Sequence, residues 1–456
     1  MKISVLGTGY VGLVSGVCLA EKGHQVVCVD IDPQKVAQTN QGIPVIFENG
    51  LEELLKKNIS TRFKATTDLA RAVKETELSI IAVGTPFNGD RIDLTYIQEV
   101  SRQIGEALKE KREYHVVVVK STVVPGTTET VVLPIIEKAS GKKGGADFGV
   151  GMNPEFLREG MAVEDFLHPD RIVLGGMDER TLDRLEALYS VFDGVDIVRT
   201  TPKTAEMIKY SANSLLATMI SFSNEIGNLC LSLGGIDVVD VMKGVHLDKR
   251  LSPILPDGRR ITPQFTTYLE AGCGFGGSCF PKDVKALIAH GKKAGRVMPL
   301  LEAVIRVNED QPRQVLEILE RHMPDVKGRR LAILGLAFKP ETDDMRESPA
   351  IPIVSQLLLA GAKLQAYDPV AQAEAKKLFG DEGITYCDSL AQAVTGMEAV
   401  ILLTRWQQFH NLADLLAQGD GQVLLIDGRR MLDKRHFTNY AGIGLGTENA
   451  IQVDCH

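Results

Sequence analysis

Apolar and polar residues alternate along the chain in blocks that predict two α/β regions separated by a helical one. Residues 2–7 form a continuous apolar run, residues 11–23 have the apolar spacing of a helix, and residues 24–30 form the next apolar run. Continuous apolar strands that alternate with helices are typical of a parallel sheet covered on both faces. The same pattern recurs in residues 77–86, 114–127 and 148–157.

From Thr201 the pattern changes to that of one long helix, which has Pro202 near its start and two glycines after its end. More helix is predicted in residues 282–325, whereas residues 251–265 are rich in proline and glycine and predict a loop. From residue 328 the alternating pattern returns. It predicts strands within residues 328–340, 363–369, 397–404 and 421–432, and a helix within residues 348–362.

These blocks predict an α/β fold with two Rossmann-like parallel-sheet domains joined by a helical dimerisation domain with one long central helix. The apolar residues of the stretch at about 203–232 are too widely spread for a single buried face. We therefore expect at least a homodimer through this helix. The predicted boundaries are 1–200, 201–300, a connecting helix at 301–327, and 328–456.

Composition and charge argue against several classes of protein and of site. A net charge of −8 and a pI near 5.7 argue against a nucleic-acid partner. No segment has the length and purity of a membrane span, and the apolar N-terminus has the glycine pattern of a strand and turn rather than of a signal peptide. The seven cysteines are scattered without metal-ligand or disulfide-framework spacing, which predicts no metal site and a reducing, cytoplasmic compartment.

The sequence GTGYVG at residues 7–12 follows the first predicted strand and opens a helix. In this context Gly7 permits the tight turn, Gly9 lets a pyrophosphate approach, and Gly12 packs helix on strand. Asp30 ends the second strand, where its carboxylate binds ribose hydroxyls and repels a 2′-phosphate. The motif predicts NAD rather than NADP; the alternative is a glycine turn that binds nothing.

Two further strand ends carry threonines. Thr85 lies in VGTP and Thr122 in KSTVVPGT, each directly after an apolar run. Ligands of open α/β sheets bind outside the carboxyl ends of the strands, so both residues are predicted to line the cofactor crevice. The alternative for each is an ordinary side-chain turn.

Other candidates for chemistry are carboxylates and an amine. Glu155 and Glu159 stand four residues apart and would share one face if their segment were helical. A solvated face is the alternative to a general base. Lys209 and Asn213 are one helical turn apart on the long helix, where Lys209 either faces a cleft or lies on the surface.

The stretch GCGFGGSCFPKD at residues 272–283 places Cys279 in a glycine-rich loop. A cysteine there is either a small buried filler or a nucleophile. Together with a hydride acceptor, a lysine–asparagine pair and a glutamate, it completes the groups needed to oxidise an alcohol to an acid. A thiolate adds to the aldehyde, oxidation of the adduct gives a thioester, and water cleaves it.

These motifs resemble those of the UDP-glucose/GDP-mannose dehydrogenase family, the NAD-dependent nucleotide-sugar 6-dehydrogenases. The resemblance implies an N-terminal NAD-binding Rossmann domain, a central helical domain for dimerisation and substrate, and a C-terminal nucleotide-sugar-binding domain. It covers nearly the whole chain in order, through GTGYVGLVSG, VGTP, KSTVVPGTT, NPEFLREG, EMIKYSAN, GFGGSCFPKD, LGLAFKPETDDMRES and DGRR.

The resemblance also implies residue roles. Cys279 is the nucleophile, Glu155 the base for thioester hydrolysis, and Thr122 helps to position water. Lys209, Asn213 and Asp283 hold the C6 oxygen and a water, with Lys209 stabilising the oxyanion. The implied NAD contacts are Gly7, Thr8, Gly9, Tyr10, Val11, Gly12, Asp30, Lys35, Thr85, Thr122, Glu159 and Arg346. The implied substrate contacts are Glu155, Phe156, Leu157, Arg158, Glu159, Lys209, Asn213, Arg250 (across the dimer), Tyr268, Glu270, Ala271, Gly272, Cys273, Gly274, Phe275, Gly276, Phe338, Lys339 and Arg429.

The sequence departs from the family pattern in two places. Asn49 replaces a proline, which predicts a local change of turn. An extra segment at residues 252–265 adjoins the predicted substrate loop and carries Arg259 and Arg260, a pair suited to phosphate. A solvated surface insertion is the alternative.

The expected function is the four-electron oxidation of UDP-glucose to UDP-glucuronate, with two NAD reduced per turnover and a nucleotide sugar as partner. GDP-mannose and TDP-glucose remain alternative substrates. A two-electron 3-hydroxyacid dehydrogenase would use Lys209 and Asn213 but has no task for Cys279. A catalytically silent NAD-binding scaffold is the third alternative.

Overall fold

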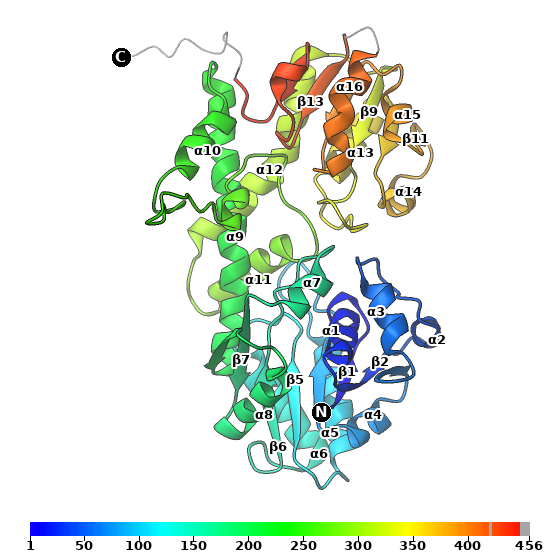
Figure 1. Cartoon of the computed structure of the whole chain (residues 1–456), viewed down its shortest axis with the longest axis vertical. Coiled ribbons are helices and arrows are strands. Elements are labelled where there is room, and N and C mark those ends of the chain that lie inside the picture. Colours follow the sequence, from blue (N-terminus) through cyan, green and yellow to red (C-terminus); the bar gives the residue numbers. More distant parts are fainter. Residues whose placement is uncertain (419–421, 447–456) are drawn as a thin grey trace. The chain divides into compact units, whose positions relative to one another are not determined.

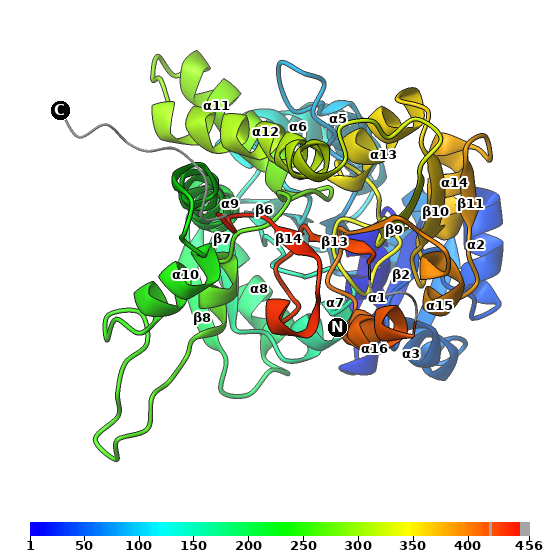
Figure 2. The same cartoon turned by 90° about the horizontal axis from the view of Figure 1, so that it is seen from above.

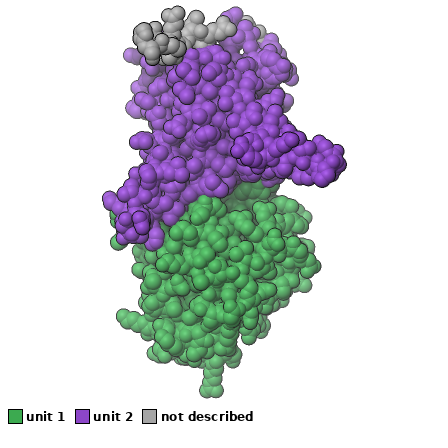
Figure 3. Space-filling model, turned by 90° about the vertical axis from the view of Figure 1, so that its left-hand side faces the viewer, with its two compact units in different colours: residues 1–212 green, residues 213–456 purple. Residues whose placement is uncertain are grey.

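The computed structural model describes residues 1–418 and 422–446 (Figure 1 and Figure 2). The chain forms two compact units, residues 1–212 and residues 213–456, which are coloured green and purple in Figure 3. The division falls within α9 (Pro202–Leu233), a helix of 32 residues. The predicted fold class, with two parallel-sheet α/β domains and one long central helix, is confirmed.

The first unit is built on an eight-stranded sheet with the strand order β3-β2-β1-β4-β5-β6-β7-β8. Strands β1 to β6 run parallel to one another. Strand β7 pairs antiparallel with β6, and β8 pairs parallel with β7, so these last two strands run opposite to the other six. Its strands are β1 (Lys2–Leu6), β2 (Gln25–Val29), β3 (Phe63–Thr66), β4 (Leu78–Ile81), β5 (His115–Val119), β6 (Phe148–Met152), β7 (Arg171–Gly176) and β8 (Asp196–Thr200).

Helices cover both faces of this sheet, as the continuous apolar strands predicted. Val116 and Val118 of β5 pack with helices α1, α3, α7 and α8, whereas Val117 and Val119 pack with α4, α5 and α6. Successive strand residues point to opposite faces, so a strand buried on both must be apolar throughout. The helical segments are α1 (Tyr10–Glu21), α2 (Pro33–Asn40), α3 (Leu51–Asn58), α4 (Leu69–Glu75), α5 (Thr95–Leu108), the π-helical η1 (Thr128–Val132), α6 (Leu133–Ser140), α7 (Ala162–Leu167) and α8 (Glu179–Tyr189).

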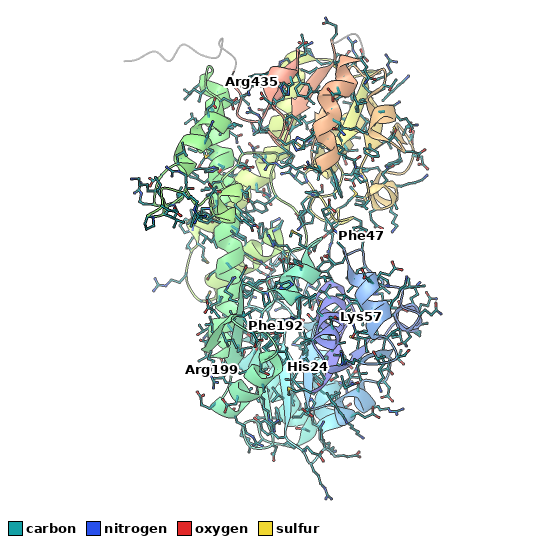
Figure 4. All side chains as sticks on the ribbon, in the orientation of Figure 1. His24, Phe47, Lys57, Phe192, Arg199 and Arg435 are labelled. Atoms are coloured by element: carbon teal, nitrogen blue, oxygen red, sulfur yellow. The ribbon has the colours of Figure 1, made fainter. Side chains whose placement is uncertain are left out.

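The edge strand β8 is mostly exposed and is held to α8 by charge. The guanidinium of Arg199, labelled in Figure 4, forms ion pairs with Glu179, Asp183 and Glu186, which all lie on α8. A network of several charges stabilises the folded state more than an isolated surface ion pair, which contributes little. The network thus fixes an edge strand that has little apolar surface of its own to bury.

The second unit contains a six-stranded, fully parallel sheet with the order β11-β10-β9-β12-β13-β14. Its two faces again have separate cores: α10, α12 and α13 pack on one, and α15, η3 and α16 on the other. The strands are β9 (Arg330–Leu334), β10 (Lys363–Tyr367), β11 (Ile384–Tyr386), β12 (Ala399–Leu402), β13 (Leu424–Asp427) and β14 (Tyr440–Gly442). The helical segments are α10 (Val238–His246), η2 (Gln264–Tyr268), α11 (Phe280–Lys293), α12 (Pro299–His322), α13 (Ala350–Leu359), α14 (Gln372–Phe379), α15 (Leu390–Val394), η3 (Gln407–Asn411), α16 (Leu412–Ala417) and η4 (Lys434–His436).

The extra segment forms an irregular hairpin that extends away from α10, as Figure 2 shows. Leu255 N donates to Arg259 O at 2.8 Å, and Ile261 N donates to Pro253 O at 2.9 Å. The Arg260 guanidinium donates to two main-chain carbonyls at the base of the hairpin, each at 2.8 Å. This arginine therefore stabilises the hairpin, and the Arg259 side chain forms an exposed ion pair with Asp257.

Six cysteines lie in the described residues and all are free thiols, whereas Cys455 lies outside them. Five of the six are buried; Cys279 is partly exposed. Within residues 1–418 and 422–446, no helix combines the length and the apolar character that crossing a membrane requires.

Candidate active site and cofactor site

The glycine turn between β1 and α1 has the geometry of a dinucleotide cradle. Gly7 has a φ of +101°, and a Cβ there would lie 2.7 Å from the carbonyl oxygen of Ala82. A Cβ on Gly12 would lie 1.9 Å from the carbonyl oxygen of Gly7, so α1 packs on the turn only without a side chain. Space is open around Gly9, where backbone N–H groups at the start of α1 favour an anion.

Asp30 stands at the end of β2 and holds the glycine turn. Its Oδ2 accepts hydrogen bonds from Thr8 N at 3.0 Å and Thr8 Oγ1 at 2.5 Å, and its Oδ1 accepts one from Asp32 N at 3.0 Å. Burial by itself raises the pKa of Asp30, but these hydrogen bonds and the Lys35 ammonium bring it below its usual value. The carboxylate is therefore charged at neutral pH and fits the role of repelling a 2′-phosphate.

The next residue, Ile31, was missed by the sequence analysis. Its side chain is 88% exposed, the largest exposed fraction among the large hydrophobic side chains of the described residues. An exposed isoleucine directly after Asp30 offers apolar surface beside the carboxylate that is predicted to bind ribose hydroxyls. The signal was present in the sequence, because an apolar residue there lies beyond the end of the buried strand.

Tyr10 takes part in the fold through its side chain. Its hydroxyl donates to Glu48, whose carboxylate also accepts hydrogen bonds from Gly160 N at 2.7 Å and Ala162 N at 2.8 Å. Tyr10 was predicted to contact the cofactor. Because its hydroxyl already binds Glu48, only its backbone is available for that contact. Glu48 is 7% exposed and was not identified from the sequence, since two of its partners, Gly160 and Ala162, lie more than a hundred residues away.

Thr85 and Thr122 are brought together as predicted for residues at neighbouring strand ends. Thr85 Oγ1 donates to the carbonyl oxygen of Thr122 at 2.7 Å, and Ser121 Oγ donates to Val83 O at 2.7 Å. The loops after β4 and β5 are thus joined beside the glycine turn of the same sheet.

A buried ion pair follows β6. Lys209 Nζ on α9 lies 2.9 Å from Glu155 Oε1, and the two side chains are 4% and 5% exposed. Leu157 N donates to the other carboxylate oxygen at 2.7 Å. Residues 153–158 are not helical, so the condition under which Glu155 and Glu159 would share one helical face is not met. Instead, the extended segment turns Glu155 inward.

Lys120 is a second buried amine, and the sequence analysis did not single it out. Its Nζ donates to Asn153 Oδ1 at 2.8 Å and lies 5.7 Å from the centre of the Phe166 ring. The pKa of Lys120 is lowered to about 8, because burial and the Lys209 ammonium together outweigh the opposing effect of the Glu155 carboxylate. The only hint in the sequence is a lysine at the carboxyl end of a wholly apolar strand.

The two amines decide the protonation of Glu155. Burial alone would raise the pKa of this carboxyl group, but the Lys209 ammonium, the Leu157 N–H and the Lys120 ammonium together bring it below its usual value. Glu155 is therefore ionised at neutral pH and able to accept a proton.

In the second unit, Cys279 is the residue immediately before α11 and is partly exposed. Backbone N–H groups at a helix N-terminus favour negative charge, which suits a thiolate. One turn into the helix, Asp283 is fully buried and accepts from Asn213 Nδ2 at 2.7 Å and Lys282 Nζ at 2.6 Å. Two of the predicted site residues, Asn213 and Asp283, therefore lie in contact, and Lys282 joins them.

The glycine loop before Cys279 packs against the segment that follows β9. A Cβ on Gly276 would lie 2.3 Å from Glu347 O, and one on Gly277 would lie 2.7 Å from the Phe338 ring. Gly277 N donates to Arg346 O at 2.8 Å. The loop is therefore glycine-rich because backbone and ring approach it closely.

Arg429 links the same loop to the C-terminal sheet. Its guanidinium donates to Gly274 O and Leu403 O, each at 2.7 Å, and to Phe338 O at 3.3 Å. The Arg429 carbonyl in turn accepts from Arg405, which forms an ion pair with Glu270. The side chain that was predicted to contact the nucleotide sugar thus donates to three main-chain carbonyls.

Other predicted ligand contacts lie at the surface of their units. Arg158 pairs with Asp165, and Arg346 pairs with Asp344 at 2.8 Å. Arg250 pairs with Asp248 and its side chain is 89% exposed. Other residues predicted to contact the substrate lie in or near the glycine loop. The rings of Tyr268 and Phe275 each contact the ring of Phe280, and the Lys339 ammonium lies over the ring of Phe338. Ala271, Gly272 and Cys273 are buried.

Comparison with known proteins covers most of the chain. The UDP-glucose/GDP-mannose dehydrogenase family matches in three parts: its NAD binding domain over residues 1–193, its central domain over residues 203–310 and its UDP binding domain over residues 332–434. The predicted resemblance is confirmed.

Individual relatives include two substrate classes. UDP-glucose 6-dehydrogenase AglM of Haloferax volcanii is 41% identical over 448 residues, covering 97% of this chain and 100% of that protein. GDP-mannose 6-dehydrogenase of Pseudomonas putida is 41% identical over 440 residues, covering 94% and 96%. A solved UDP-glucose dehydrogenase from Pyrobaculum islandicum aligns with a TM-score of 0.87 at 40% identity, covering 97% and 98%.

A solved GDP-mannose dehydrogenase from Pseudomonas aeruginosa aligns with a TM-score of 0.54 at 37% identity, covering 97% and 100%. The glycine cradle and the charged Asp30 of this chain agree with the NAD binding domain matched over the same residues, so NAD is the cofactor. The protein therefore belongs to the UDP-glucose/GDP-mannose dehydrogenase family, which carries out NAD-dependent 6-dehydrogenation of nucleotide sugars.

Proposed function

We propose that the protein oxidises UDP-glucose to UDP-glucuronate by removing four electrons from C6. The observation that carries this proposal is the partly exposed Cys279 at the start of α11, one turn from the buried carboxylate of Asp283. A two-electron dehydrogenase stops at the carbonyl and needs no nucleophile. An enzyme that continues to the acid must first convert the aldehyde into an adduct that has a hydride to lose.

Bound NAD accepts the hydride that C6 loses in each of the two oxidations. In the first oxidation the C6 hydroxyl also loses its proton, and an aldehyde forms. The roles proposed for Lys209 and Asn213 are to hold the C6 oxygen and to stabilise negative charge on it. Both are buried side chains on α9, one helical turn apart in sequence, so their own positions are well fixed.

In the second oxidation the Cys279 sulfur bonds to C6 and the aldehyde oxygen takes up a proton, which gives a thiohemiacetal. Loss of the C6 hydride and the hydroxyl proton then leaves a thioester on Cys279. Asp283 keeps Asn213 and Lys282 oriented through its two carboxylate oxygens during these steps.

Hydrolysis of the thioester needs a base. Glu155 is assigned this role because it is ionised at neutral pH and its carboxylate can accept a proton from water, although its lowered pKa makes it a weaker base than a free glutamate. The water oxygen bonds to C6, the C–S bond breaks, and the thiolate of Cys279 is regenerated. Thr122, whose carbonyl is fixed by Thr85, is proposed to position the water.

The choice of UDP-glucose over GDP-mannose rests on the comparisons. The two classes of relative are equally similar in sequence, but the solved UDP-glucose dehydrogenase aligns better than the solved GDP-mannose dehydrogenase.

We also propose that a second copy of the chain covers the exposed apolar face of α9. Leu215, Phe222 and Leu229 recur every seventh residue and are 62%, 47% and 53% exposed. Residues spaced by seven lie on one face of a helix. Arg250, which has a high exposure in the single chain, is the residue proposed to reach the nucleotide sugar of the partner.

The substrate is tested by assaying NADH formation with a panel of UDP-, TDP- and GDP-sugars. We expect kcat/KM for UDP-glucose to exceed that for GDP-mannose and TDP-glucose by at least about tenfold, the ratio given by about 1.4 kcal/mol of differential binding. A preference for GDP-mannose would replace the proposed substrate and leave the thioester chemistry in place.

Cys279→Ser tests the covalent step. An alkoxide forms poorly at neutral pH, so we expect uronate formation to fall by at least about 10³-fold. Product analysis by mass spectrometry measures the uronate directly. The matched control is Cys387→Ser, which changes a buried thiol outside the candidate site. Uronate production at the wild-type rate in Cys279→Ser would contradict the assignment.

Asp30→Ala tests cofactor selection. Loss of charged hydrogen bonds worth roughly 1.5–3 kcal/mol each should weaken NAD binding and relax discrimination against NADP. Because Asp30 also holds the glycine turn through Thr8, Thr8→Val is the control. It should loosen the turn yet keep the NAD/NADP ratio of kcat/KM. A wild-type protein that prefers NADP would refute this interpretation of Asp30.

Phe222→Asp tests the proposed dimer by analytical ultracentrifugation at micromolar concentration. A carboxylate in the centre of the apolar face should shift the protein from dimer to monomer, since an unpaired buried charge is strongly unfavourable. Leu359→Asp, at a side chain that is 87% exposed on α13, should leave the mass unchanged. A monomeric wild-type protein would contradict the proposal.

A further inference from the structure

Glu206 is a fully buried carboxylate that none of the proposed catalytic steps uses. It lies on α9, three residues before Lys209, with a relative exposure of 0%. Among the described residues, the ion pairs of the first unit do not include Glu206. Burying a charged group in such a place destabilises the folded state unless hydrogen bonds replace its lost hydration.

The hydrogen bonds come from the turn that follows β5. Glu206 Oε2 accepts from Gly126 N at 2.5 Å, and Oε1 accepts from Thr128 N at 2.8 Å and Thr128 Oγ1 at 2.6 Å. Thr128 begins η1, so the carboxylate also lies at the N-terminal end of a helical segment, which favours negative charge. Both carboxylate oxygens are therefore occupied by donors of one short turn.

The turn at Gly126–Thr128 ends the loop that follows β5, and Thr122 lies near the start of this loop. Thr122 is tied to the neighbouring strand end by Thr85, and Gly126 takes a φ of +96° where the chain reverses. The π-helical η1 continues directly into α6, and π-helical turns are frequent at functional sites. Glu206 thus fixes the far end of a loop whose near end is fixed by the sheet.

We propose that Glu206 is a positioning residue, whose carboxylate fixes the Gly126–Thr128 turn to α9 and thereby sets the position of Thr122 for NAD and water. The same helix holds Glu155 through Lys209 one turn later. Helix α9 therefore fixes the loops after β5 and β6 relative to each other. This inference rests on the proposed role of Thr122 in the function above.

The test compares Glu206→Gln with Glu129→Gln. In the glutamine variant one oxygen becomes an NH₂ group, which faces a backbone N–H in either orientation and loses at least one hydrogen bond. Glu129 is exposed on the same turn and undergoes the same change of charge and shape. Burial raises the pKa of Glu206 to about 7. Measurements at about pH 8 therefore keep the carboxylate mostly ionised.

We expect amide hydrogen exchange of residues 121–132 to accelerate in Glu206→Gln without NAD present, and not in Glu129→Gln. Titration calorimetry should show NAD affinity reduced by about three- to tenfold, less than the full loss of a hydrogen bond to a charged group, because the lost bond affects NAD only through the position of Thr122. UDP-glucose affinity should be unchanged. Unchanged exchange and NAD affinity, with only a lower melting temperature, would overturn the proposal.

Thr128→Val and Thr128→Ser provide a second comparison that does not depend on whether Glu206→Gln folds. The valine removes the hydroxyl donor and should weaken NAD binding and speed exchange of the turn, whereas the serine keeps the donor and should restore both. Equal behaviour of the two variants would overturn the proposal. If the wild type fails to oxidise UDP-glucose, the proposed function fails, while exchange and NAD binding still decide the role of Glu206.

Discussion

The need to satisfy buried polar groups on α9 governs how both units are built. Glu206, Lys209 and Asn213 are at most 7% exposed, and each requires a partner, because an unpaired buried charge or amide group is energetically unfavourable. Lys209 binds Glu155 from the loop after β6, and Asn213 binds Asp283 from α11. Glu206 binds the turn after β5. In the first unit the helix therefore fixes the loops after β5 and β6, and in the second unit it fixes the first turn of α11.

Close approach of the backbone is the second constraint. In the first unit, α1 contacts the turn after β1 only because Gly12 has no side chain. In the second, Gly276 and Gly277 lie against Glu347 and the ring of Phe338. Both turns are glycine-rich for reasons of packing. At the first turn the space around Gly9 is also open, so fold and binding favour the same residues there.

Several predicted ligand contacts also hold the fold through their side chains. Asp30 binds the glycine turn, the Tyr10 hydroxyl binds Glu48, and the Arg429 guanidinium binds three carbonyls. A substitution at such a position changes the shape of the site as well as a contact. Loss of ligand affinity at Arg429, for instance, would reflect displacement of the glycine loop that it supports.

The sequence alone determined the two α/β regions, the long helix and the glycine turn with Asp30, because apolar periodicity and glycine spacing are local signals. It also placed Lys209 and Asn213 one turn apart on that helix. It did not predict the reversed strands β7 and β8, the extended segment that turns Glu155 inward, or the burial of Lys120 and Glu206. Those features depend on partners distant in sequence. Whether a lysine or glutamate is a solvated side chain or a buried ion is decided by which elements pack around it, and only the tertiary structure specifies that.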